Sequence, residues 1–267
     1  MNFQSKLDKI VKKNNSLLCV GLDSNFDKLP KKFKRLKYPQ FEFNKWIIKQ
    51  TADLVCGYKP NAAFYEARGD QGIKELKMTM SYLSRYYGDI FTILDAKRAD
   101  IGSTNEGYVK AIFDWLGFDA VTLHPYLGKE AMEPFLSRKD KGCIILCRTS
   151  NPGAGEFQDL KTGGKMLWRV IAEKVRDDWN KNNNCMLVVG ATYPEELKEI
   201  RKATGDMTFL VPGIGAQGGD VEKTVKAGLN SKGAGMIINS SRGIIFANNP
   251  REEAVRLRDE INKYRKS

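Results

Sequence analysis

The chain has 267 residues, 42% of them hydrophobic and 28% charged, which is ordinary for a globular protein and excludes a disordered chain. No apolar run approaches the roughly 18 residues of a membrane span, and residues 1–16 lack the apolar segment of a signal peptide. The net charge of +12 permits an anionic partner, but its basic residues are spread out, with one denser patch at 28–37, and no nucleic-acid-binding motif accompanies them. We therefore expect neither a membrane nor a nucleic-acid partner.

The cysteines and the histidine bear on location and metal binding. The five cysteines lie in or beside apolar runs and form no C-x-x-C pair: Cys19, Cys56, Cys143, Cys147 and Cys185. This usage is typical of buried thiols in a reducing cytosol, so we predict a cytoplasmic protein. Only one histidine is present, and no cysteines have the spacing of zinc ligands. We therefore expect no metal site.

Eight apolar, β-branched runs bounded by turn residues follow one another along the chain. These predicted strands are residues 16–23, 54–61, 90–97, 119–125, 142–150, 185–191, 208–214 and 235–241. Segments of helical periodicity lie between or after them, at 41–53, 73–87, 105–116, 164–182, 194–202, 220–228 and 250–263.

In a chain close to the typical length of about 250 residues, this alternation predicts an α/β fold, a (β/α)8 TIM barrel, as a single domain over residues 1–267. A doubly wound sheet would favour about five or six strands and a G-x-G-x-x-G turn after the first. The first strand ends instead in VGLD.

Polar side chains end most of the predicted strands, where barrel enzymes carry their working residues. These positions hold Asp23, Lys59, Asn61, Asp95, Lys97, His124, Thr149 and Ser150, and the last two loops add Gln217 and Arg242. A scaffold protein has little reason for this pattern, so it predicts an active site. We assign His124 no catalytic role, because a lone histidine is more often a structural wall residue.

The third strand ends in a carboxylate, an ammonium and a second carboxylate: Asp95, Lys97 and Asp100. Residues two apart in a strand point to one side, so Asp95 and Lys97 should project together. Buried charges are costly unless they are paired, and this spacing pairs them in the manner of a positioned proton donor. A surface salt-bridge cluster that caps a helix is the alternative interpretation of these residues alone.

The loops after the seventh and eighth strands are suited to phosphate, which barrels often bind at this place. The first is glycine-rich, GIGAQGGD, and offers the Gln217 amide; the second, SSRG, offers the Ser241 hydroxyl and the Arg242 guanidinium. Either loop alone is also compatible with an ordinary glycine-containing turn between two elements. Both together at these positions favour a phosphate site.

Residues 95–104, DAKRADIGST, resemble the signature D-x-K-R-x-D-I-G-x-T of the bacterial branch of the orotidine 5′-phosphate decarboxylase family. Six further motifs agree in order along almost the whole chain: CVGLD, YKPN, PYLG, CRTSNPGAG, VPGIGAQGGD and NSSRGIIFA. The resemblance implies a homodimeric barrel enzyme that converts orotidine 5′-phosphate to UMP and carbon dioxide in pyrimidine synthesis. It also implies that the reaction uses neither metal nor cofactor.

The resemblance further implies roles for the charged residues. Lys97 would protonate C6 of the pyrimidine as the carboxylate departs, and Asp95 would lie beside that carboxylate. Asp100 and Thr104 would reach across the homodimer interface into the partner's site. There Asp100 would complete a charge array that also contains Lys59.

The remaining implied contacts bind the nucleotide. Asp23 and Lys59 would contact the ribose hydroxyls, Ser150 the pyrimidine amide edge, and Gln217 with Arg242 the phosphate. The expected substrate-binding residues are Asp23, Asn61, Thr104, Thr149, Ser150, Pro212, Gln217, Ser241 and Arg242. The loops 152–164 and 214–220 are candidates to close over the substrate.

Two other functions are weighed against this one. A magnesium-dependent sugar-phosphate decarboxylase or synthase on the same barrel shares the looser D-x-K-x-x-D core, but it lacks the extended match through residues 101–104. A basic, non-catalytic nucleic-acid binder is the third interpretation. Salt-dependent binding of oligonucleotides without turnover would support it.

Overall fold

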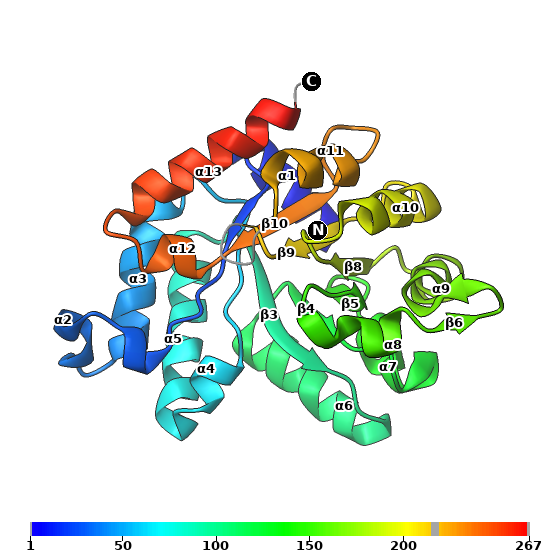
Figure 1. Cartoon of the computed structure of the whole chain (residues 1–267). Helices are drawn as coiled ribbons and strands as arrows, with labels where there is room; N and C mark the ends of the chain where they lie inside the picture. Colours follow the sequence, from blue (N-terminus) through cyan, green and yellow to red (C-terminus); the bar gives the residue numbers. More distant parts are fainter. Residues whose placement is uncertain (1, 215–218, 266–267) are drawn as a thin grey trace.

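The computed structural model describes residues 2–214 and 219–265. Parallel strands close into a barrel in the order β1-β10-β9-β8-β5-β4-β3-β2 (Figure 1). The barrel strands are β1 (Leu18–Val20), β2 (Gly57–Tyr58), β3 (Phe91–Arg98), β4 (Ala120–Leu123), β5 (Gly142–Arg148), β8 (Cys185–Val189), β9 (Phe209–Pro212) and β10 (Met236–Ser240). The predicted (β/α)8 barrel is therefore confirmed.

Helices surround the barrel and link its strands (Figure 1). The longer ones are α1 (Phe3–Asn14), α3 (Pro39–Thr51), α5 (Gly69–Tyr86), α6 (Gly102–Val109), α7 (Gly128–Leu136), α9 (Leu167–Lys174), α10 (Pro194–Thr204), α11 (Val221–Gly228) and α13 (Pro250–Arg265). The short ones are α2 (Lys31–Lys34), α4 (Ala63–Glu66), α8 (Gly155–Gln158) and α12 (Arg242–Ile245). No helix within residues 2–214 and 219–265 is long and apolar enough to cross a membrane.

Most strands are shorter than the apolar runs that predicted them. The run at 54–61, for example, contributes only Gly57 and Tyr58 to β2, and Asn61 forms a single isolated bridge with Asp95. Pro60 in this run has no N–H to donate to a neighbouring strand. Leu54, Val55 and Cys56 precede the paired residues and are buried, so the apolar run extends beyond the strand on that side.

The predicted helix over 164–182 begins only at Leu167, because the residues before it form a hairpin. Strands β6 (Lys161–Thr162) and β7 (Lys165–Met166) pair antiparallel. Gly163 and Gly164 join them with φ values of 56° and 77°, the left-handed backbone that a two-residue hairpin turn requires. After α9 the helix continues as a π-helical stretch to Trp179.

Helix α1 was not among the predicted helices, and it closes the amino end of the barrel. Its buried residues Phe3, Leu7 and Ile10 recur at helical spacing. The Phe3 ring lies 6.3 Å from the ring of Phe91 at the start of β3. Lys6 pairs with Asp119, which precedes β4, at 2.7 Å. The opposite, carboxyl end of the barrel is therefore the end that holds a cavity.

Candidate active site

A cavity of about 540 Å³ lies at the carboxyl ends of the barrel strands. It brings together predicted site residues from both halves of the chain: Asp23, Lys59, Asn61, Asp95, Lys97, Thr149, Ser150, Pro212, Ser241 and Arg242. Asp100 and Thr104 do not line it, and Gln217 lies outside the described residues. A volume of this size is in the range of small-molecule sites.

The centre of the cavity wall is a carboxylate between two ammonium groups. Lys59 Nζ lies 2.8 Å from Asp95 Oδ2, and Lys97 Nζ lies 2.6 Å from Asp95 Oδ1. Thr122 donates its hydroxyl to Asp95 Oδ1 at 3.0 Å. Lys59 is buried, whereas the Lys97 side chain is half exposed to the cavity. Lys97 is thus the ammonium that a bound ligand can reach.

The two buried members of this cluster hold each other in their charged forms. Burial alone would raise the pKa of Asp95, but Lys59 and Lys97 outweigh it and keep the pKa well below its usual range. Burial alone would lower the pKa of Lys59, but the charges of Asp95 and Asp23 outweigh it and raise the pKa above its usual value. The site therefore keeps a fixed array of full charges at neutral pH.

Asp95 and Lys97 converge as predicted, but not through simple strand alternation. The pairing of β3 with β4 shifts register between Leu94 and Arg98, and Lys97 has a φ of 47°. The backbone N–H groups of Ala96 and Lys97 both donate to Thr122 Oγ1 at 3.0 Å. A left-handed lysine costs about 1–2 kcal/mol, and such strain typically lies at functional sites.

Sequence reasoning missed several residues of the wall, and Thr122 is the clearest. It lies inside an apolar strand, β4, and its buried hydroxyl orders both the Asp95 carboxylate and the bulge at Lys97. Asn239, a polar residue in the apolar strand β10, also lines the cavity. A polar residue within an otherwise apolar barrel strand was the signal that could have found both.

Asp23 and Asn61, in the segments that follow β1 and β2, flank the charged cluster. Asp23 Oδ1 is buried and has no hydrogen-bond partner among the described residues. The Asn61 amide donates to Asp95 Oδ2 at 3.5 Å, and its oxygen accepts from Ala63 N at 3.1 Å. A buried acceptor without a donor is uncommon in proteins, so Asp23 is suited to a ligand that supplies hydroxyl groups.

The opposite wall comes from the end of β5 and the segment 152–160. Thr149 N donates to Gln158 Oε1 at 2.9 Å, and Gln158 Nε2 donates to Thr149 Oγ1 at 2.8 Å, which places Gln158 of α8 in the wall. Gly190 at the end of β8 lets Ser150 approach, since a Cβ there would lie 2.9 Å from Ser150 Cβ. The predicted covering loop 152–164 thus includes a helix and part of a hairpin.

Asp100 and Thr104 follow the charged end of β3, in the turn before α6 and in α6 itself. Asp100 Oδ1 accepts from Ile101 N at 2.7 Å, and Asp100 N donates to Asn105 Oδ1 at 2.9 Å. Thr104 in α6 is exposed. Neither side chain joins the cavity of its own chain.

His124 makes a structural contact with the backbone outside the cavity. Its ring Nε2 lies 3.0 Å from the carbonyl oxygen of Ala99, and the residue does not line the cavity. Among residues 2–214 and 219–265, no group of three or more His, Cys, Asp or Glu side chains is arranged to hold a metal ion.

Fold and site together define a parallel-barrel enzyme with an array of paired charges at the strand ends. Residues 16–257 match the family model described as "Orotidine 5′-phosphate decarboxylase / HUMPS family". The chain therefore belongs to this family, as its motifs predicted.

Named relatives agree with the family match. The chain is 48% identical to the orotidine 5′-phosphate decarboxylase of Cellvibrio japonicus over 98% of both chains, and 45% identical to that of Ralstonia pickettii over 99% and 100%. The solved Leishmania donovani OMP decarboxylase superposes with a TM-score of 0.90, at 38% identity and full coverage of both chains. These relatives confirm the predicted enzyme class, a carboxy-lyase.

Proposed function

We propose that the chain converts orotidine 5′-phosphate to UMP and carbon dioxide without a metal or cofactor, as the last step of UMP synthesis. The observation that carries the proposal is the fixed array in which Asp95 lies between buried Lys59 and accessible Lys97. A proton donor and a carboxylate held side by side are what a decarboxylation needs. We infer the substrate from the relatives, which are named orotidine 5′-phosphate decarboxylases.

In the proposed reaction, the bond between C6 and the carboxylate carbon breaks, and its electron pair stays on C6. Lys97 Nζ then delivers a proton to C6, so that UMP forms and the lysine is left neutral until water reprotonates it. Asp95 lies beside the departing carboxylate, and its negative charge favours loss of that group as neutral carbon dioxide. Lys59 keeps Asp95 in place, so little reorganisation is needed during the reaction.

The rest of the nucleotide is proposed to lie along the other strand ends. The unpartnered oxygen of Asp23 would accept from a ribose hydroxyl. Arg242, which is exposed and forms no ion pair with any described residue, would bind the phosphate together with Ser241. Gln217 is proposed for the same contact. Phosphate binding far from C6 can then favour closure of the site and assist the chemical step.

We also propose a homodimer in which Asp100 and Thr104 enter the partner's site. Both lie outside the cavity of their own chain, and large apolar side chains are exposed next to Asp100 in the sequence and in the segment after β4. Ile101, Tyr126 and Leu127 are 60%, 85% and 45% exposed. Apolar groups of this size on a surface mark contacts with another protein. A second copy would cover them and make the whole chain, as one domain, half of the active unit.

The cysteines support a cytoplasmic location for this enzyme. The five thiols are free and buried, and burial raises the pKa of Cys19 and of Cys185 to about 12. Thiols that stay protonated and buried suit a reducing compartment.

The test is an assay of the purified chain in which turnover of orotidine 5′-phosphate is measured as a loss of absorbance. We expect decarboxylation that EDTA leaves unchanged and that Lys97→Ala abolishes. Absence of turnover by the intact chain, or full turnover by the variant, rejects the proposal. Loss of activity in EDTA and its return with Mg²⁺ would favour the magnesium-dependent group within the same family.

A further inference from the structure

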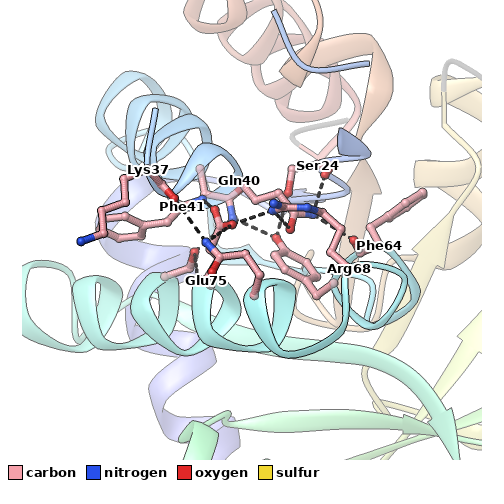
Figure 2. Close-up of polar contacts among 11 residues, drawn as sticks. Ser24, Lys37, Gln40, Phe41, Phe64, Arg68 and Glu75 are labelled. Atoms are coloured by element: carbon pink, nitrogen blue, oxygen red, sulfur yellow. Dashed lines mark hydrogen bonds and ion pairs between the residues drawn. The ribbon is translucent and has the colours of Figure 1, made fainter. Parts of the chain in front are cut away.

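The loop that carries Asp23 rests on a network of buried polar side chains behind the cavity wall. Figure 2 shows its centre, where Gln40 of α3 points toward Ser24, Phe64 and Arg68. Gln40 is fully buried and does not line the cavity. Its contacts therefore act on the protein and not on a ligand.

Gln40 ties together the loops that follow β1 and β2. Its Nε2 donates to the carbonyl oxygens of Ser24 at 2.8 Å and Phe64 at 2.9 Å. Its Oε1 accepts from Arg68 Nη1 at 3.0 Å. Only one orientation of the amide satisfies all three contacts, because two partners are acceptors and the third is a donor. Ser24 directly follows Asp23, so the amide fixes one side of that residue.

Tyr65 of α4 fixes the other side of Asp23. Its hydroxyl donates to the carbonyl oxygen of Leu22 at 2.8 Å. The same hydroxyl accepts from Ser24 Oγ at 3.2 Å and from Asn44 Nδ2 at 2.9 Å. The ring and hydroxyl are fully buried. The carbonyl groups before and after Asp23 are thus both held by side chains from outside the cavity.

An ion pair between a partly exposed arginine and a buried glutamate holds the far end of the network. Arg68 Nη1 lies 2.6 Å from Glu75 Oε1, and Glu75 Oε2 accepts from Phe41 N at 2.9 Å at the start of α3 (Figure 2). Glu75 is fully buried, and the Arg68 guanidinium packs over the Phe26 ring at 4.4 Å. A largely buried pair of this kind adds little net stability, because desolvation offsets the attraction. The main effect of the pair is to fix the position of Arg68 relative to the start of α3.

We propose that Gln40 and Tyr65 are positioning residues for Asp23: they hold the backbone on both sides of it, so that its carboxylate meets the ribose of the substrate. The inference rests on the proposed function, in which Asp23 accepts from a ribose hydroxyl. Since Gln40 also holds Phe64 of α4, in the segment after β2, it sets the place of Asp23 relative to Lys59.

The consequence for the reaction is that these residues act through Asp23 alone. Loss of the Gln40 amide frees the Ser24 carbonyl and lets the Asp23 loop shift. A shift of about 1 Å in a substrate contact can cost roughly 100-fold in rate, so we expect Gln40→Met to lower kcat/KM by about 10- to 100-fold. Methionine keeps the length of the side chain and removes its hydrogen bonds.

The experiment is a double-mutant cycle of Gln40→Met with Asp23→Ala, measured as kcat/KM for orotidine 5′-phosphate. If Gln40 acts through Asp23, Gln40→Met should cost less than about twofold once Asp23 is alanine. A residue that merely stabilises the fold would cost the same factor in both backgrounds. Thermal unfolding of each variant checks that the chains are folded at the assay temperature.

Asn184 provides a matched control at the other end of the barrel. It is fully buried, and its Nδ2 donates to the carbonyl oxygens of Leu136 at 3.0 Å and Arg138 at 3.1 Å. Asn184→Leu therefore removes the same kind of contacts away from the cavity. We expect it to lower the melting temperature while it changes kcat/KM by less than about twofold.

Tyr65→Phe keeps the ring and removes only the hydroxyl, so it repeats the test if Gln40→Met does not fold. Equal losses in the two Asp23 backgrounds, or an equal loss in Asn184→Leu, overturn the positioning role. A wild-type chain without turnover instead rejects the proposed function itself, and the inference with it.

Discussion

The two walls of the cavity differ in how firmly the rest of the barrel holds them. On the β2–β3 side, Asp95 is bound by Lys59 at 2.8 Å and by Lys97 at 2.6 Å, and Lys59 is buried. On the β5 side, the segment 152–160 reaches the barrel through a few side chains, and its Phe157 is 64% exposed. The β2–β3 side, with Lys59, Asp95 and Lys97, is formed by the strand ends themselves and is the fixed wall. The segment 152–160 is the covering segment, and it forms the covering wall.

Two side-chain contacts connect the segment 152–160 to the end of β5. Gln158 exchanges hydrogen bonds with Thr149, and Asp159 pairs with Arg148 at 3.1 Å. Charges that act on reacting atoms must not reorganise, so they belong on the fixed wall. The closure proposed for the segment 152–160 requires that few contacts break when it opens, and this segment meets that requirement.

The largest effect should come from the fixed wall. Lys97→Ala removes the proposed proton donor, so we expect kcat to fall by at least about 10³-fold while the chain still folds. Steady-state turnover and thermal unfolding measure the two quantities. Lys198→Ala, which removes an exposed lysine of α10, is the control and should be fully active. A Lys97→Ala chain with more than a tenth of wild-type activity would remove this residue from the mechanism.

Mixing two inactive chains tests whether the fixed wall is completed by a partner. If Asp100 serves the partner's site, a dimer of one Lys97→Ala chain and one Asp100→Asn chain has one intact site. An equal, freely exchanged mixture should then regain about a quarter of wild-type activity, because half of the dimers are mixed. If Asp100 serves its own site, no activity returns.

Lowering the pH should reduce the stability that the ion pairs of Asp95 give to the folded chain. The pKa of Asp95 is lowered in the folded chain, so its stabilisation is present above the usual carboxyl pKa and is lost as pH falls toward the folded value. Asp95→Asn leaves Lys59 buried without its partner, and we expect a loss of about 3 kcal/mol at pH 7. Urea unfolding should show that the difference in the free energy of unfolding between wild type and Asp95→Asn becomes smaller below about pH 5. A difference that does not depend on pH would contradict a lowered pKa of Asp95.

A smaller effect is expected on the covering wall. Asp159→Asn weakens the contact with buried Arg148, so hydrogen exchange in 152–160 should speed up and kcat/KM should fall by about tenfold or less. The melting temperature should change little. Asp114→Asn breaks a comparable pair with Arg138, 2.9 Å apart, away from the cavity, and should leave both readouts unchanged. Equal exchange in both variants would mean that the covering segment does not depend on this pair.

The smallest effect belongs to His124, which lies outside both walls. His124→Gln keeps a group that can donate to the Ala99 carbonyl, so kcat/KM should change by less than about threefold. Measured beside Lys97→Ala, a comparable loss would show that the histidine takes part in the reaction.

Local sequence patterns predicted the barrel and many of the polar residues of the cavity wall. Strand and helix periods depend on neighbours in the chain, and polar residues such as Lys59, Asp95 and Arg242 stand at the ends of apolar runs. Since parallel strands of a barrel end on one face, these residues could be brought together without coordinates. Helix α1 was not predicted although its buried residues follow helical spacing, and the β6–β7 hairpin lies where a helix was expected.

By itself, the sequence determined which residues end the strands and which family the chain belongs to. Only the tertiary structure decided how those ends are held. Thr122 and Lys97 meet through a shift between β3 and β4, and Gln40 reaches the Asp23 loop across 16 residues of chain. Such contacts join segments with no shared local pattern, so the closed barrel alone sets their distances and decides which charges are buried.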